Sequence, residues 1–232
     1  MKLLVTGGLG FIGSNFILHI LKNNPDYEII NVDDELLGSN HQSLLSIENS
    51  ENYQFVKGNI TDHSLMEKLI SECDQVVNFA AESHVDRSIS NAKPFIDSNI
   101  LGTFTILEIL KHHKKRLIQI STDEVFGDLK SGSAIENSLL NPSSPYSSSK
   151  ASAELLVNSY ILTYGIRAII TRCTNNYGPR QFIEKLIPKT IILADQNRKI
   201  PLYNNGKGVR DWIHVDDHCA AISKIILDGI DG

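Results

Sequence analysis

The stretch Gly7-Gly-Leu-Gly-Phe-Ile-Gly13 directly follows the apolar run Leu3-Leu-Val-Thr6 and directly precedes an amphipathic stretch long enough for a helix. Glycines at such a junction let the chain turn tightly and let backbone N–H groups approach a pyrophosphate at the N-terminus of the helix. The same glycines also fit a plain strand-to-helix turn. The segments that follow decide between these two interpretations.

Strand-like apolar runs alternate with helix-length amphipathic stretches up to about residue 178. Strands are predicted at residues 2–6, 28–33, 53–57, 75–79, 116–122 and 167–173, and helices at 11–22, 62–72, 94–113 and 145–164. Alternation of this kind predicts an α/β fold with a doubly wound parallel sheet of the Rossmann type. Near-continuous apolar strands such as Val76-Val-Asn-Phe79 fit strands that are buried on both faces.

Beyond residue 178 the alternation fades. A helix is expected at 182–196, a short strand at 200–203, a turn at 204–208 and a last helix at 216–227. We therefore divide the chain into a dinucleotide-binding domain, residues 1–180, and a partial C-terminal region, residues 181–232. The polar stretch 127–145 is long for a loop inside an α/β domain, which indicates a lid or a binding loop.

Asp33 ends the second predicted strand, twenty residues after Gly13, where a carboxylate accepts hydrogen bonds from the adenosine ribose of a dinucleotide. Asp34 and Glu35 stand beside it and no Arg is near in the sequence, so a ribose 2′-phosphate would be repelled and NAD is favoured over NADP. Residues after the third and fourth strands either line the cofactor or simply end their strands. The predicted cofactor-binding residues are Gly7, Gly10, Phe11, Ile12, Gly13, Asp33, Asn59, Ile60, Ala80 and Ala81, joined by Tyr146 and Lys150.

Composition excludes several classes of function. The 232 residues carry a net charge of −5, without the basic stripe of a nucleic-acid binder. No apolar run is long enough for a bilayer and the N-terminus lacks a signal-peptide core, so no membrane partner is expected. The three widely spaced cysteines, Cys73, Cys173 and Cys219, predict a reducing cytoplasm. His214-Val-Asp-Asp-His218 lacks the Glu of a zinc-protease motif, so we expect no metal site.

Tyr146 and Lys150 lie four residues apart in the helix predicted at 145–164, and therefore on one face of it. An ammonium group beneath a phenol favours the phenolate, which makes a phenol with a pKa of about 10 usable as a base. Such a pair indicates alcohol oxidation. Thr122-Asp123-Glu124 closes the strand predicted at 116–122 and adds two further proton-transfer groups. By themselves these residues also fit a helix start, a solvated lysine and an acidic turn.

Five further stretches resemble motifs of the dTDP-glucose 4,6-dehydratase family, in the nucleotide-sugar branch of the extended short-chain dehydrogenases/reductases. They are Asn78-Phe-Ala-Ala-Glu-Ser-His-Val-Asp-Arg-Ser88, Ser121-Thr-Asp-Glu-Val-Phe-Gly127, Arg172-Cys-Thr-Asn-Asn-Tyr-Gly-Pro179, Glu184-Lys-Leu-Ile-Pro188 and Val209-Arg-Asp-Trp-Ile-His-Val-Asp-Asp217. The resemblance runs from Met1 to the last residue with the motifs in the family's order. It implies a lyase that binds NAD and a nucleotide sugar.

The resemblance also implies a role for each candidate catalytic residue. Tyr146, supported by Lys150, would take the proton of the sugar 4-hydroxyl as a hydride passes from C4 to NAD, and Thr122 would hydrogen-bond the same hydroxyl. Glu124 would remove the C5 proton, and Asp123 would protonate the departing 6-hydroxyl. Return of the hydride to C6 would give a 4-keto-6-deoxy sugar. A base and an acid on one side of the sugar suit this chemistry.

Six more residues resemble family positions near the substrate. Ser83 and His84 would lie by the sugar, Asn176, Glu184 and Lys185 would hold the nucleotide diphosphate, and Arg210 would bind phosphate, a role that suits a guanidinium. Each of the six also fits surface polarity or a cap, and the substrate role is favoured for Asn176 and Arg210.

The sequence departs from the family pattern at three places. Phe126 stands where a Tyr is common, and the stretch 33–40 carries an acidic residue where a Lys is expected. Family members also continue beyond residue 232, so we expect a truncated chain. A UDP-sugar 4,6-dehydratase, an epimerase, a decarboxylase and an inactive NAD-binding fragment remain alternatives, although Asp123-Glu124 argues against the epimerase and the decarboxylase. A homodimer built on the helices at 94–113 and 145–164 is expected from the resemblance.

Overall fold

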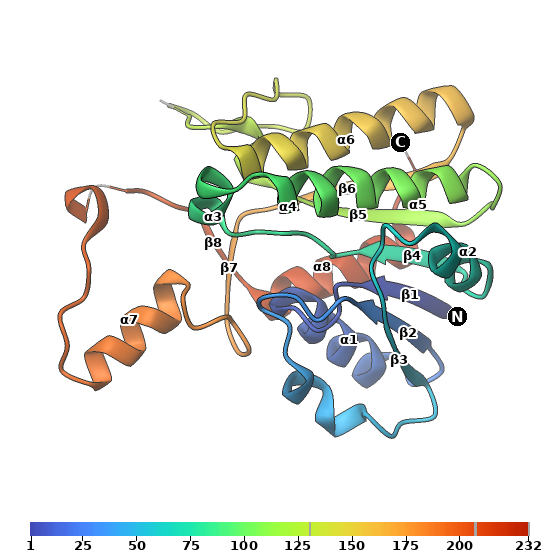
Figure 1. Cartoon of the computed structure of the whole chain (residues 1–232), viewed down its shortest axis with the longest axis horizontal. Helices are drawn as coiled ribbons and strands as arrows, with labels where there is room; N and C mark the ends of the chain where they lie inside the picture. Colours follow the sequence, from blue (N-terminus) through green and yellow to red (C-terminus); the bar gives the residue numbers. More distant parts are fainter. Residues whose placement is uncertain (130, 207, 232) are drawn as a thin grey trace.

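The computed structural model describes residues 1–129, 131–206 and 208–231 (Figure 1). At its centre lies a six-stranded parallel sheet with the strand order β3-β2-β1-β4-β5-β6. The strands are β1 (Lys2–Thr6), β2 (Glu28–Asp33), β3 (Tyr53–Lys57), β4 (Gln75–Asn78), β5 (Arg116–Thr122) and β6 (Arg167–Cys173). The predicted doubly wound sheet is confirmed. Its order reverses between β1 and β4, and ligands bind to open α/β sheets at such a reversal.

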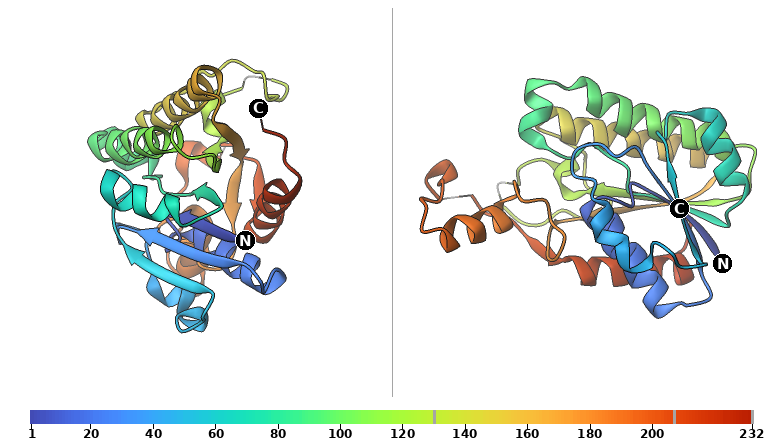
Figure 2. Two further views of the ribbon diagram at one scale, coloured as in Figure 1. Left: turned by 90° about the vertical axis from the view of Figure 1, so that its right-hand side faces the viewer. Right: turned by 60° about the horizontal axis from the view of Figure 1, so that its bottom comes forward.

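Helices cover both faces of the sheet, as Figures 1 and 2 show. On one face Leu3 and Val5 pack with α1 (Phe11–Asn23) and α8 (Val215–Asp228). On the other face Leu4 packs with α2 (His63–Ser71), α5 (Thr103–Leu110) and α6 (Pro145–Tyr164). Successive side chains of a strand point to opposite faces, so the continuous apolar run of β1 contributes to two cores.

The helix that carries Tyr146 and Lys150 has well-formed ends. Ser144 is its N-cap, and the Ser144 and Ser147 side chains each accept from the other residue's backbone N–H, which forms a capping box. Pro145 occupies the first turn, where its missing N–H has no partner to lose. Gly165 ends the helix at φ +65, a conformation that glycine adopts without strain. These ends fix where α6 starts relative to β5.

The long helix expected at 94–113 runs without a break from Lys93 to Leu110 and ends three residues earlier than expected. It consists of α4 (Lys93–Phe95), a π-helical segment η2 (Ile96–Gly102) and then α5. Gly102 lies against Ile60, and a Cβ added to Gly102 would stand 2.3 Å from Ile60 Cδ1. The π-helical segment was not predicted, since apolar periodicity does not register a wider turn.

Several short elements were not anticipated from the sequence. They are η1 (His41–Ile47), α3 (Val85–Ser90), η3 (Asp123–Phe126), η4 (Tyr203–Gly206) and the parallel pair β7 (Asn175–Tyr177) and β8 (Trp212–His214). The strand expected at 200–203 does not form, and η4 covers the start of the turn expected at 204–208, whose residue 207 lies outside the described residues. The strand expected at 75–79 ends one residue earlier, at Asn78.

The C-terminal part of the chain has two different environments. Helix α7 (Leu186–Asp195) has no buried residue and stands away from the sheet in Figure 1 and in the right-hand view of Figure 2. Helix α8 returns to the sheet, where Val215, Cys219, Ile222 and Ile226 join the core beside α1. The division at residue 180 remains a prediction. Within the described residues, no helix combines the length and the apolar character that crossing a membrane requires.

Candidate active site

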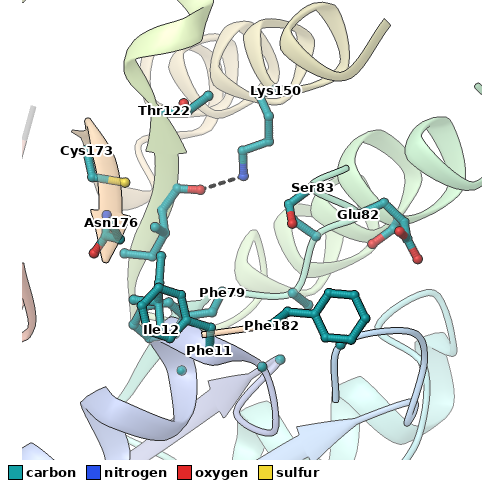
Figure 3. A pocket seen from close by; sticks show the side chains of 18 of the residues that line it. Phe11, Ile12, Phe79, Glu82, Ser83, Thr122, Lys150, Cys173, Asn176 and Phe182 are labelled. Atoms are coloured by element: carbon teal, nitrogen blue, oxygen red, sulfur yellow. Dashed lines mark hydrogen bonds between the residues drawn. The ribbon is translucent and has the colours of Figure 1, made fainter. Parts of the chain in front are cut away.

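A cavity of about 510 Å³ opens at the carboxyl ends of the parallel strands (Figure 3). Its wall is formed by the turn after β1, the segments after β2, β3 and β4, the end of β5, the start of α6 and the segment after β6. Parallel strands bring their carboxyl ends to one edge, so residues distant in sequence meet here. Every predicted catalytic and cofactor-binding residue lines this cavity.

The glycine turn forms a wall of backbone atoms. Gly7 has φ +67, and a Cβ on it would stand 2.7 Å from the Ala80 Cα. A Cβ on Gly13 would stand 2.4 Å from the Gly7 carbonyl oxygen. Gly10, the N-cap of α1, offers no side chain to the N–H groups of the first turn. This cradle of backbone N–H groups at a helix start fits the pyrophosphate of a dinucleotide.

Asp33 is buried and organises the loop that follows β2. Its Oδ2 accepts from the Leu9 N–H at 3.0 Å, and its Oδ1 accepts from the Glu35 N–H at 2.9 Å and the Ser39 hydroxyl at 2.7 Å. A carboxylate accepts about four hydrogen bonds, so one position remains for a ribose hydroxyl. Asp33 therefore fits its predicted role while also holding the glycine turn.

The charges around Asp33 bear on the choice between NAD and NADP. Asp34 lines the cavity and accepts from Asn59 Nδ2 at 2.8 Å. Lys57 is paired with Glu35, which also contacts His41. The sequence argument considered only arginine, and the structure adds a nearby lysine whose charge Glu35 offsets. The preference for NAD is thus supported by Asp33 and Asp34, which line the cavity, while Glu35 and Lys57 offset each other.

Tyr146 and Lys150 are both buried in α6 and line the cavity. Lys150 Nζ donates to the Ile120 carbonyl of β5 at 2.6 Å, the bond drawn in Figure 3. Burial lowers the pKa of Lys150 to about 8. Burial and the nearby Glu124 raise the pKa of the Tyr146 phenol. The expected lowering of this pKa is therefore not found in the free protein, where desolvation and a nearby carboxylate raise it.

The Thr122-Asp123-Glu124 group sits where β5 ends and η3 begins. The Thr122 hydroxyl accepts from the Glu124 N–H and donates to Asp123 Oδ1, each at 3.2 Å. Burial and then the neighbouring Asp123 raise the pKa of Glu124. A carboxylate with a raised pKa is a stronger base near neutral pH. The group thus places an activated carboxylate and a second carboxyl beside Tyr146.

The structure brings four of the six predicted substrate residues into the cavity wall and leaves two outside it. Ser83, Lys185, Asn176 and Arg210 line the cavity. Lys185 Nζ donates to the Ser83 carbonyl at 3.3 Å. His84 and Glu184 do not line it. Glu184 instead pairs with Arg87 at 3.1 Å and approaches His84 Nε2 to 3.7 Å, so their substrate roles remain predictions.

Asn99 does not line the cavity but supports its wall, and the sequence analysis missed it. It is buried in the π-helical segment, where Oδ1 accepts from the Glu82 N–H at 2.9 Å and Nδ2 donates to the Glu82 carbonyl at 3.0 Å and the Ser149 hydroxyl at 2.8 Å. Ser149 in turn donates to the Tyr146 carbonyl at 2.7 Å. Asn99 thereby joins the segment before Ser83 to the start of α6. The apolar periodicity that predicts a helix here does not indicate that Asn99 makes these contacts.

Cys173 also lines the cavity and was not predicted to. It is the register partner of Thr122 on the neighbouring strand. The rule that strand ends meet at one edge would have found it. Among the described residues there is no group of three or more His, Cys, Asp or Glu side chains arranged to hold a metal ion.

Deprotonation of buried Lys150 is expected to affect stability at alkaline pH. The folded pKa of about 8 lies below the usual value, so the unfolded chain binds more protons above pH 8. The unfolding free energy of the wild type, relative to Lys150→Met, should therefore rise between pH 8 and pH 10, by up to about 1.4 kcal/mol per pH unit. Urea titrations of both proteins across this range measure the difference. A difference that does not change with pH would contradict the buried charge.

Comparisons with known proteins agree with this arrangement. The family model described as GDP-mannose 4,6 dehydratase matches residues 4–230. The dTDP-glucose 4,6-dehydratase of Mycobacterium tuberculosis is 47% identical over 232 residues, which cover 99% of this chain and 70% of that protein. The dTDP-glucose 4,6-dehydratase of Bacillus anthracis, solved in complex with NAD, has a TM-score of 0.94 and 46% identity, covering 100% of this chain and 73% of that one.

A second solved structure gives the same result. DesIV of Streptomyces venezuelae, a dTDP-glucose 4,6-dehydratase solved with NAD and TYD bound, has a TM-score of 0.96 and 43% identity. The match covers 100% of this chain and 74% of DesIV.

Proposed function

Because this chain belongs to the GDP-mannose 4,6-dehydratase family, among its dTDP-glucose 4,6-dehydratases, we propose that it converts dTDP-glucose to dTDP-4-keto-6-deoxyglucose with bound NAD. The observation that carries the proposal is the meeting of two sets of groups in one cavity. Tyr146 and Lys150 serve alcohol oxidation, and Asp123 and Glu124 serve the loss of water. An epimerase needs the first set alone.

The cofactor would lie along the glycine turn. The first turn of α1 would bind the pyrophosphate, Asp33 the adenosine ribose, and Asn59, Ile60, Ala80 and Ala81 would line the remaining length. NAD supplies the acceptor for the C4 hydride and the donor that returns it to C6. All other steps are proton transfers by side chains of this chain.

One of these transfers belongs to the oxidation at C4. Tyr146 would take the proton of the 4-hydroxyl, and Thr122 would orient that hydroxyl. The raised pKa of Tyr146 in the free protein implies that the phenol is protonated until ligands bind. The Lys150 ammonium, fixed by the Ile120 carbonyl, would stabilise the phenolate as it forms.

The other two transfers concern C5 and C6. Oxidation at C4 acidifies the C5 proton, which Glu124 would remove, and its raised pKa suits a general base. Asp123 would donate a proton to the leaving 6-hydroxyl. The two carboxyl groups belong to consecutive residues directly after the end of β5. The rigid end of that strand therefore positions both of them.

Incubation with dTDP-glucose and, separately, UDP-glucose tests the reaction and its base selectivity. The expected product has lost one water, forms from dTDP-glucose in preference, and appears without net accumulation of NADH. Mass spectrometry of the sugar nucleotide measures it. Preference for UDP-glucose would make the chain a UDP-sugar 4,6-dehydratase. A product that keeps its 6-hydroxyl would overturn the proposal in favour of an epimerase or a decarboxylase.

An inactive fragment is the remaining alternative, since the chain spans 70% of the M. tuberculosis protein. Calorimetric titration with NAD, together with the turnover assay, distinguishes an active dehydratase from an inactive NAD-binding fragment. Binding of NAD without turnover of either sugar nucleotide would support the fragment.

Substitution of the two carboxyl groups should block elimination and spare oxidation. Glu124→Gln keeps the size of the side chain and removes the base, so we expect dehydration to slow about 10²-fold or more. Asp123→Asn removes the proton donor with a similar effect. Because C4 oxidation persists, absorbance of the reduced nicotinamide should build up in a single turnover. Dehydration at the wild-type rate by both variants would refute these roles.

A homodimer through α5 and α6 is part of the proposal. Leu101 and Phe104, on η2 and α5, and Leu155 and Leu162 of α6 are exposed apolar side chains on these neighbouring helices. A second copy that covered them would remove this apolar area from water. Leu155→Lys with Leu162→Lys should convert the dimer to a monomer in analytical ultracentrifugation. A monomeric wild type would contradict the dimer.

The free cysteines support a reducing, cytoplasmic location.

A further inference from the structure

A lysine lies directly beside the carboxylate that would bind the adenosine ribose of the cofactor. Strands β2 and β3 are neighbours at one edge of the sheet (Figure 1), and their last residues, Asp33 and Lys57, are register partners. Ile29 and Tyr53, the first pair of this ladder, both pack in the core on the side of α1. Side chains four residues further along a strand return to the same face. Asp33 and Lys57 therefore project from one face as neighbours.

A cation at this position matters because the adenosine ribose distinguishes the two nicotinamide dinucleotides. NADP differs from NAD by a phosphate on the ribose 2′-oxygen. In NAD-binding Rossmann domains a carboxylate at this place hydrogen-bonds the 2′-hydroxyl, whereas in NADP-binding domains a nearby Arg accommodates the 2′-phosphate. A free ammonium beside Asp33 would attract that phosphate in the same way.

The Lys57 ammonium is not free in this chain, because Glu35 pairs with it. Oε2 of Glu35 contacts Lys57 Nζ, and Oε1 lies 2.5 Å from His41 Nε2. The hydrogen bond and the charge of Glu35 raise the pKa of Lys57, so the lysine stays charged while the carboxylate offsets its charge. The pair lies outside the cavity wall, to which Asp33 and Asp34 contribute.

The backbone of Glu35 is held in the conformation that makes this contact. Its N–H donates to Asp33 Oδ1 at 2.9 Å, and its φ is +56. This left-handed region favours glycine and is uncommon for residues with a long side chain. A residue held in such a conformation points to a use for its side chain.

We propose that Glu35 makes the cofactor site selective against NADP, because its carboxylate offsets the Lys57 ammonium that would otherwise attract the 2′-phosphate. Asp33 favours NAD by accepting from the 2′-hydroxyl, and Glu35 disfavours NADP by neutralising the neighbouring cation. The inference rests on the part of the proposed function in which the cavity binds NAD. It does not depend on the sugar nucleotide.

Calorimetric titration of the full chain with NAD and with NADP tests this role. Glu35→Gln keeps the length of the side chain and removes only its charge. Glu35→Gln combined with Lys57→Met removes the ammonium as well. Glu48→Gln is the matched control, because Glu48 follows η1 close to Tyr53 of β3, and its loss removes one negative charge while the Glu35–Lys57 pair stays intact.

The ratio of the NADP dissociation constant to the NAD dissociation constant separates the four proteins. We expect this ratio to fall about fivefold in Glu35→Gln, an effect of the size that exposed ion pairs give. It should return to within about twofold of the wild type in the double variant and stay unchanged in Glu48→Gln. An unchanged ratio in Glu35→Gln would overturn the inference, as would an equal fall in Glu48→Gln. A fall that persists in the double variant would do so too, since Lys57 would then not be responsible.

The salt dependence of binding gives a second reading of the same contact. A phosphate attracted by one more ammonium should bind more weakly as salt rises, so the salt slope for NADP should steepen in Glu35→Gln while the slope for NAD does not. Equal NADP slopes in variant and wild type would count against Lys57. A chain that binds NAD but turns over neither sugar nucleotide would refute the proposed reaction, and the ratio would still decide the role of Glu35. A chain that binds neither dinucleotide would overturn both.

Discussion

Replacement of Tyr146 by phenylalanine is expected to lower kcat about 10³-fold, within the range that a positioned proton-transfer group supplies. In the proposed mechanism the phenol takes the proton of the sugar 4-hydroxyl, and the variant removes only the phenol oxygen. The ring should stay in place, because it is 8% exposed and packs edge to face against Phe95 at 6.3 Å. Steady-state kinetics with dTDP-glucose measures the loss.

Tyr160→Phe provides a matched control for this result. Tyr160 lies on the same helix with the same 8% exposure, and its hydroxyl donates to Glu108 away from the cavity. Removal of that hydroxyl should leave kcat within about twofold, since no proton transfer depends on it. If the two variants lost the same activity, the effect of Tyr146→Phe would be one of packing in α6 and not of catalysis.

Loss of the Arg172 guanidinium should be the most destabilising single change at the site. Glu154 of α6 is fully buried, and Arg172 of β6 donates to both of its carboxylate oxygens at 2.7 to 3.1 Å. Arg172→Met leaves that carboxylate buried without a partner, which costs about 3–5 kcal/mol. For a chain of this size the melting temperature should fall by about 10 °C.

Two further variants identify the cause of this loss. Arg167 lies on the same strand as Arg172, and Arg167→Met breaks its exposed ion pair with Asp231. Such exposed pairs contribute only about 0–1 kcal/mol. Arg172→Met combined with Glu154→Leu removes both charges and should recover most of the lost stability. Calorimetric melting curves of the four proteins measure these differences. A single variant Arg172→Met that melts within 2 °C of the wild type would show that the pair contributes little.

Arg172 also connects the pair to the cavity. Its Nη1 donates to the Glu136 carbonyl at 3.0 Å, and its guanidinium lies over the Phe126 ring at 5.1 Å. The Arg172–Glu154 pair thus joins α6, the polar stretch 127–145 and the η3 turn that carries Asp123 and Glu124. The stretch predicted as a lid or binding loop is held beside the η3 turn by Arg172 and also by the Asn141 N–H, which donates to the Val125 carbonyl at 2.9 Å.

Local sequence patterns were sufficient for most of the fold. The glycine turn, the period-two and helical periodicities and the caps of α6 depend on neighbours a few residues away, and the structure confirms the six main strands, of which one ends a residue early. Parallel strands bring their carboxyl ends to one edge, and the predicted polar residues at those ends lie together there in the structure. Thr122, Asp123, Glu124, Asp33 and the residues after β3 and β4 all line the cavity.

The tertiary structure alone decided how those residues are held and charged. The π-helical turn that brings Asn99 inward, the pairing of β7 with β8 and the contact between His218 and Asn176 depend on segments 17 to 42 residues apart. The raised pKa of Tyr146 depends on burial, which no local pattern encodes. The sequence by itself determined the sheet, the cofactor turn and the catalytic groups, because short-range geometry specifies them. Side-chain orientation and proton affinity required the packed molecule, because desolvation and long-range contacts exist only there.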